Sequence, residues 1–126
     1  MRVYVAGKYS ADNVIDVLGN IHDGIKVSAQ IMKAGMNPFC PFLDYQFQFF
    51  DKSLTVEDYY RYSMAWLEVS DVVFVLPGWE NSKGTLAEIK RAEELGIRII
   101  YEDINELIGY YIATKKPKDM FKFKKE

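Results

Sequence analysis

The chain has 126 residues, and its 49% apolar content predicts one folded domain with a substantial core. Six lysines against Asp119 and Glu126 give residues 115–126 a charge of +4, so the net charge of −2 leaves an acidic body of −6, which argues against dedicated nucleic-acid binding. No apolar run is long enough to span a bilayer, and the sequence shows no signal peptide and only one cysteine, so we expect a cytoplasmic protein away from membranes. With a single histidine as well, we expect no metal site, and we expect no cofactor.

The first predicted elements are a strand and a long helix. Arg2 to Ala6 (RVYVA) predicts a short strand, followed directly by Gly7 to Ser10 (GKYS). Ala11 to Ala34 predicts a helix that breaks near Gly19-Asn20, where Asn20 caps the second half, and Gly35 ends it. The cation and hydroxyl of GKYS suit a phosphate, although these residues can equally form a simple polar turn.

A proline-rich and then aromatic region follows. Asn37 to Phe42 (NPFCPF) predicts a short strand near a sheet edge, because proline cannot donate to a central ladder. The aromatic side chains that crowd Leu43 to Trp66 can line a nucleobase pocket, pack a subunit interface or fill the core. Thr55 and Asp58 predict a capped helix start, with the helix running to about Val69.

The most informative stretch lies between Ser70 and Ile89. Val72 to Leu76 predicts a buried strand that ends at Pro77-Gly78. Ser82 can cap the next helix, and Gly84 allows backbone N–H groups to approach a ligand closely. A helix N-terminus at the carboxyl end of a strand is a ready anion site.

Helical geometry draws attention to Glu88. With Thr85 set at zero and about 100° per residue, Glu88 lies near 300°, inside the apolar arc of the helix. Glu93 falls in the same arc near 80°, but a turn further from the loop. Carboxylates are rarely buried without a partner or a role, so Glu88 is either functional or a flanking surface residue.

The remaining elements complete an alternating pattern. Ile97 to Tyr101 predicts another buried strand, and a last helix runs from Glu102-Asp103 to about Ala113. We therefore expect one α/β domain over residues 1–114, a Rossmann- or flavodoxin-like parallel sheet of four to five strands with helices on both faces. Residues 115–126 would form a frayed basic tail. Ligands of such sheets bind at the carboxyl ends of the strands, where Trp79 either contacts the ligand or packs its own loop.

Three stretches of this sequence resemble the nucleoside 2-deoxyribosyltransferase superfamily, which includes the deoxynucleoside 5′-monophosphate N-glycosidases. They are VYVAGKYS, PFCPFLDY and SDVVFVLPGWENSKGTLAEI, and together the resemblance covers roughly residues 1 to 101. Its most specific part is the Ser-x-Gly-x-x-x-Glu spacing of Ser82, Gly84 and Glu88. Within the superfamily, the chain is most similar to a small phage and bacterial branch.

The resemblance implies a role for each matching residue. Glu88 matches the nucleophile that attacks the anomeric carbon of the sugar, and we expect it to be ionised at neutral pH. Ser82 matches a hydroxyl that binds the 5′-phosphate, and Gly7 to Ser10 match the first ligand-binding loop. Within that loop Lys8 and Ser10 would contact the substrate, and Tyr9 would hydrogen-bond the nucleophile. The relatives also form homo-oligomers whose subunits complete one another's sites.

The sequence departs from these relatives at Ser63. Many relatives carry an aspartate there, eight residues before the aspartate that corresponds to Asp71, and it helps the base to leave. A serine hydroxyl is not acidic enough for that task. Glu57 or Asp58, about a turn and a half earlier, could substitute for the aspartate, although Asp58 more simply serves the helix start. Two functions therefore stay open: cleavage or exchange of the base of a 2′-deoxynucleoside or its 5′-monophosphate, and non-catalytic nucleotide binding by a sensor of the same fold.

Overall fold

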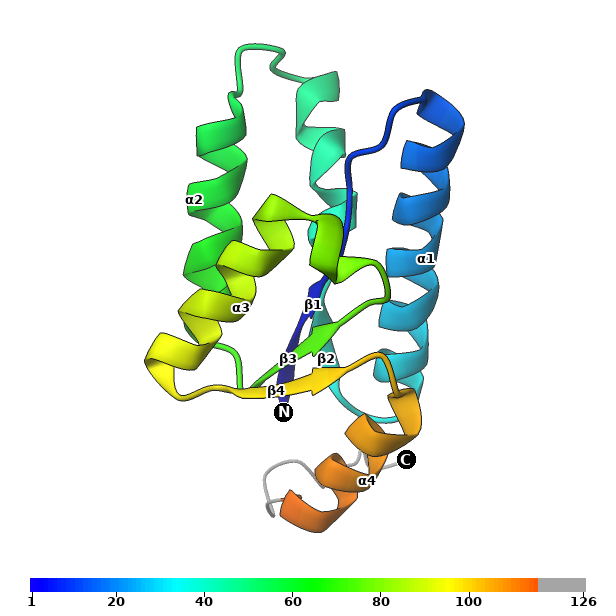
Figure 1. Cartoon of the computed structure of the whole chain (residues 1–126), viewed down its shortest axis with the longest axis vertical. Coiled ribbons are helices and arrows are strands. Elements are labelled where there is room, and N and C mark those ends of the chain that lie inside the picture. Colours follow the sequence, from blue (N-terminus) through cyan, green and yellow to red (C-terminus); the bar gives the residue numbers. More distant parts are fainter. Residues whose placement is uncertain (116–126) are drawn as a thin grey trace, which may run out of the picture.

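The computed structural model describes residues 1–115, so the predicted basic tail lies, except for Lys115, outside the described residues. Its sheet has four parallel strands in the order β2-β1-β3-β4 (Figure 1). The strands are β1 (Arg2–Ala6), β2 (Asn37–Phe39), β3 (Val72–Val75) and β4 (Arg98–Tyr101). This arrangement confirms the predicted α/β fold, including the parallel pairing of β1 with β3.

Helices cover both faces of the sheet, as predicted. Side chains of α1 (Val14–Lys33) and α4 (Ile104–Thr114) pack on the face that carries Val3 and Val5. Those of α2 (Val56–Leu67) and α3 (Lys83–Leu95) pack on the opposite face, which carries Tyr4 and Ala6 (Figure 1). Because side chains alternate along a strand, β1 delivers Tyr4 beneath α2 and α3. None of the helices within residues 1–115 is apolar enough over sufficient length to cross a bilayer.

The first helix differs from the prediction. It runs without a break for 20 residues, and Asn13 caps it by accepting a hydrogen bond from the Asp16 amide. Asn20 caps nothing; its side chain donates to the Tyr9 carbonyl at 3.1 Å. The buried face of α1 packs on the sheet and on Phe42 through both halves of the helix, and this tertiary packing outweighs the weak helix propensity of Gly19.

The region between β2 and α2 is a 3₁₀ helix, η1 (Pro41–Phe49). It is anchored by Phe42, which is buried against α1, where a Cβ on Gly24 would lie 2.3 Å from the ring. The edge strand is confirmed but shorter than predicted. The capping box of Thr55 and Asp58 is also confirmed, so Asp58 serves the helix start. A short 3₁₀ turn, η2 (Trp79–Asn81), links β3 to α3.

Candidate active site

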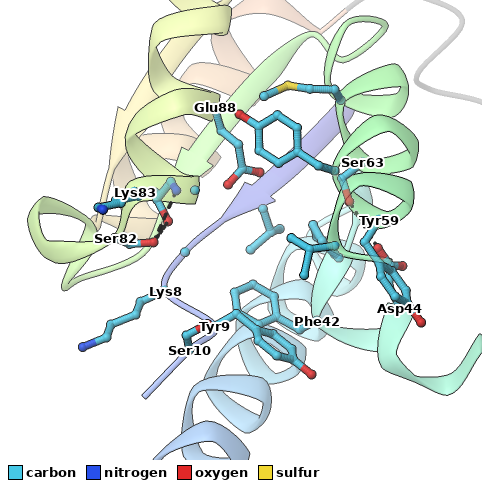
Figure 2. A pocket seen from close by; sticks show the side chains of 18 of the residues that line it. Lys8, Tyr9, Ser10, Phe42, Asp44, Tyr59, Ser63, Ser82, Lys83 and Glu88 are labelled. Atoms are coloured by element: carbon cyan, nitrogen blue, oxygen red, sulfur yellow. Dashed lines mark hydrogen bonds between the residues drawn. The ribbon is translucent and has the colours of Figure 1, made fainter. Parts of the chain in front are cut away.

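A crevice opens at the carboxyl ends of β1 and β3. The chain passes from β1 outward to β2 and then returns through β3 to β4, so the strand order reverses between β1 and β3. Doubly wound sheets bind their ligands at this topological switch point. The cavity has a volume of about 710 Å³ and is lined by β1 and the loop after it, η1, α2 and the first turns of α3 (Figure 2). Its size suits a ligand of nucleotide dimensions.

Glu88 projects from α3 into this crevice (Figure 2). It is partly buried on the side of α3 that also buries Thr85, Ile89 and Ala92, whereas Glu93 is exposed. The structure therefore separates the two carboxylates that helical geometry left in one arc. Of the pair, only Glu88 lines the cavity.

Burial raises the pKa of Glu88 to about 7, while a hydrogen bond from the Tyr4 hydroxyl lowers it. Burial therefore works against the ionised form that the sequence predicts for Glu88, and the Tyr4 hydrogen bond favours it. The phenol that reaches Glu88 is that of Tyr4, which is fully buried, and not that of Tyr9.

The loop after β1 forms one wall of the crevice. The Tyr9 ring packs against Phe42 with ring centroids 6.5 Å apart. Gly7 is required for close packing, because a Cβ there would lie 2.8 Å from a methyl carbon of Leu76. Lys8 and Ser10 also line the cavity, and the Lys8 side chain extends away from Glu88 (Figure 2).

The N-terminus of α3 forms a second wall with the features of an anion site. The Ser82 hydroxyl oxygen accepts hydrogen bonds from the amide and the hydroxyl of Thr85, at 3.3 and 2.9 Å, so its own proton can be donated to a ligand. Lys83 adds a cation, and both it and Gly84 line the cavity. No atom lies within 4 Å of a Cβ built on Gly84, so the first turn faces open space.

Trp79 lies apart from the other predicted site residues. It does not line the cavity; its ring packs on Tyr101 of β4 with centroids 5.1 Å apart. Its indole Nε1 is buried and has no hydrogen-bond partner in the described part of the chain. Of the two interpretations of Trp79, ligand contact is not supported, and the ring packs on β4 rather than on its own loop.

Sequence reasoning missed Asp44, a second carboxylate in the crevice. It belongs to η1 and accepts a hydrogen bond from the Ser63 hydroxyl at 3.2 Å (Figure 2). Burial raises the pKa of Asp44 to about 6, and the Ser63 hydrogen bond lowers it. An acid within the apolar stretch PFLDY was the available signal. Ser63 thus lines the crevice beside a carboxylate from another element.

Residues 1–101 match a protein family described as a domain of unknown function, DUF4406. The chain belongs to this family. The match ends at the last residue of β4, so the DUF4406 region contains the whole sheet and every residue of the crevice. The search of curated proteins found no match.

Proposed function

We propose that this protein cleaves the N-glycosidic bond of a 2′-deoxynucleoside 5′-monophosphate, with Glu88 as the nucleophile. The observation that carries the proposal is the carboxyl of Glu88 inside a nucleotide-sized crevice, on the same helix whose N-terminus faces that crevice. Glutamate side chains of a helix lean toward its N-terminus, which brings the carboxyl toward the anion site at Ser82. A phosphate there would hold the sugar over Glu88.

The chemistry is a double displacement at the anomeric carbon. A Glu88 oxygen attacks C1′, the C1′–N bond breaks, and the base leaves with the bonding electrons and takes up a proton. Attack by water on the resulting glycosyl ester releases deoxyribose 5-phosphate and restores Glu88. Attack by a second base gives a new nucleotide, which is the transferase outcome.

The resemblance to the nucleoside 2-deoxyribosyltransferase superfamily supports the same reaction. Its Ser-x-Gly-x-x-x-Glu spacing falls on the helix that frames the crevice, with Ser82 as the N-cap and Glu88 inside. By the same resemblance we propose a homo-oligomer that acts on small-molecule nucleotides without a cofactor.

The test is release of free base from each of the four 2′-deoxynucleoside 5′-monophosphates, followed by chromatography. Deleting a covalent nucleophile removes several kcal/mol of transition-state stabilisation, so Glu88→Gln should lower the rate by roughly a thousandfold or more while nucleotide binding persists. Glu93→Gln is the matched control, because it removes an exposed carboxylate from the same helix.

Two results would contradict the proposal. Base release by Glu88→Gln within tenfold of the wild-type rate would show that Glu88 is not the nucleophile. Tight binding of a monophosphate by the wild type, with no base released from any of the four, would favour the nucleotide sensor instead.

A further inference from the structure

The two carboxyls of the crevice are joined by a chain of hydroxyl groups. Ser63 donates to Asp44 at 3.2 Å, and the Tyr4 hydroxyl makes hydrogen bonds with both Ser63 and Glu88. The four residues come from four different elements, η1, α2, β1 and α3, and all of them line the same cavity. Tyr4 is fully buried, so its hydroxyl is held in place between the other two side chains.

Counting hydrogens shows what the chain can do. Three hydrogen bonds link the four groups, but the hydroxyls of Ser63 and Tyr4 supply only two protons. When both carboxyls are ionised, one of the three contacts therefore lacks a proton. One added proton completes the chain, and it can reside on either carboxyl, because each hydroxyl both donates and accepts.

The position of that proton decides whether the site can react. With the proton on Glu88, Asp44 is charged and the nucleophile is blocked. If each of the three protons moves one place along the chain, Glu88 becomes ionised and Asp44 becomes protonated, with no proton gained from or lost to solvent. A site in that second state holds a free nucleophile and a neutral acid together.

The arrangement of the crevice places Asp44 where the departing base of a bound nucleotide would lie. Ser82 and Lys83 lie on one side of Glu88, and Asp44 lies on the other (Figure 2). A nucleotide with its phosphate at the N-terminus of α3 and its sugar over Glu88 would direct its base toward Asp44. The neighbouring aromatic residues Tyr45 and Tyr59 offer surfaces for that base.

We propose that Asp44 is the acid that protonates the departing base, and that Ser63 and Tyr4 carry the necessary proton to it from Glu88. This inference rests on the proposed glycosidase function. In the first step, Glu88 bonds to C1′, the C1′–N bond breaks, and the Asp44 proton passes to the base nitrogen. In the second step, Asp44 accepts a proton from the water that attacks C1′, which returns the site to its starting state.

The groups around the two carboxyls leave them free to exchange this proton. Within residues 1–115, the titratable groups that interact with Asp44 and Glu88 are phenols and a thiol, all with raised pKa values: Tyr4, Tyr9, Cys40, Tyr59 and Tyr60. These stay neutral near pH 7. The two carboxyls are therefore the groups of this cluster that titrate near neutrality.

The experiment compares two substrates that differ in their need for an acid. The first is the 2′-deoxynucleoside 5′-monophosphate with the fastest base release, and the second is 4-nitrophenyl 2-deoxyribofuranoside 5-phosphate, whose phenolate leaves without a proton. Release is followed over the first turnover, because Asp44 also accepts the proton of the attacking water in the second step. Asp44→Asn should then lower base release by about 100-fold or more, the range of general acid catalysis, and change 4-nitrophenolate release by less than about threefold. Glu88→Gln should abolish both.

Variants at Ser63 test the proton path. Ser63→Ala leaves Asp44 in place but removes the link, so it should lower base release by about tenfold or more and leave 4-nitrophenolate release unchanged. Ser63→Thr keeps the hydroxyl and should restore most of the base release. Glu57 is an exposed carboxylate of α2, so Glu57→Gln is the control for the loss of charge in Asp44→Asn.

The possible outcomes separate this inference from the function on which it rests. Equal losses on both substrates for Asp44→Asn would show a structural role and overturn the inference, as would full base release by that variant. Release of 4-nitrophenolate by the wild type, with no base from any monophosphate, would refute Asp44 as an acid but keep Glu88 as the nucleophile. Release of neither product would refute the glycosidase function itself.

Discussion

The chemistry of the crevice depends on one phenol that sequence reasoning passed over. Tyr4 lies in the middle of β1 with no exposed surface, and its hydroxyl stabilises the ionised form of Glu88. Tyr4→Phe should therefore raise the pKa of Glu88 above about 7. A hydrogen bond to a charged group contributes about 1.5–3 kcal/mol, so 4-nitrophenolate release, which needs no acid, should fall at pH 7 and recover about one to two pH units higher.

A pH–rate profile measures this shift, because the profile of kcat/KM reports the groups that titrate in the free enzyme. Tyr9→Phe is the matched control, since Tyr9 lines the same crevice but makes no hydrogen bond to Glu88. A loss of rate in Tyr4→Phe that is equal at all pH values would contradict a role in holding the charge.

The residues that the sequence did and did not reveal differ in how they are positioned. Helical periodicity located Glu88, because it depends on a single element whose buried side follows from local spacing. Tyr4 and Asp44 approach it through the pairing of β1 with β3 and through the packing of η1 under α1. Both are contacts between distant parts of the chain, and local spacing carries no information about them.

At the scale of elements, the N-terminus of α3 has two tasks that a suitable variant separates. Ser82→Ala would remove both the cap, which contributes about 1 kcal/mol, and the proposed phosphate contact. Ser82→Asp keeps a capping oxygen but places a negative charge at the anion site. It should leave the melting temperature close to wild type and weaken binding of a monophosphate by about tenfold or more, with a smaller effect on the corresponding nucleoside.

Calorimetric titration of the monophosphate and of the nucleoside into the wild type and into Ser82→Asp measures the four affinities to be compared. Equal weakening for the two ligands would argue against a phosphate at Ser82. Equal affinity of the wild type for the two ligands would exclude a phosphate site altogether.

A second prediction at this scale concerns Gly84. Its Cβ position is open, and alanine favours a helix over glycine by about 1 kcal/mol, so Gly84→Ala should keep or raise the melting temperature. If a phosphate approaches this backbone, the added methyl group should nevertheless weaken monophosphate binding. Undiminished binding in the folded variant would place the phosphate elsewhere.

The elements themselves were mostly predictable, and the exceptions have a physical cause. Caps with strong local chemistry, such as Ser82 and the Thr55–Asp58 pair, fixed two helix starts correctly. The break expected at Gly19-Asn20 does not occur, because α1 spans the sheet and its packing holds the weak residues in helical form. The aromatic density of η1 gave no hint of a 3₁₀ helix, whose short turns lack a distinctive period.

For the whole molecule, the crevice should make stability depend on pH. The pKa values of Glu88 and Asp44 are raised in the folded protein, to about 7 and about 6. The folded protein therefore favours the protonated form of both carboxyls. The stability that they contribute is fully present below their unfolded pKa values near 4, where both are protonated, and it is lost as the pH rises through 6 to 7 and they ionise inside the crevice. For Glu88, the shift from 4.5 to about 7 corresponds to at most about 3 kcal/mol.

Glu88→Gln should consequently be more stable than the wild type at pH 8, with a difference that shrinks toward pH 4. Denaturant unfolding at several pH values measures this difference, and Glu93→Gln provides the reference for an exposed carboxylate. A difference that stays constant across pH would show that Glu88 has an ordinary pKa in the folded state.

The position of β1 in the sheet has a further consequence during protein synthesis. In the pairing of β1 with β3, Val3 lies opposite Val72, 69 positions later in the chain. At translation rates of about 5–20 residues per second, the ribosome needs roughly 3 to 14 seconds to add that intervening stretch. Throughout this interval the apolar first strand lacks the neighbour that buries it, so a nascent chain stalled before residue 72 is where chaperone binding and misfolding would concentrate.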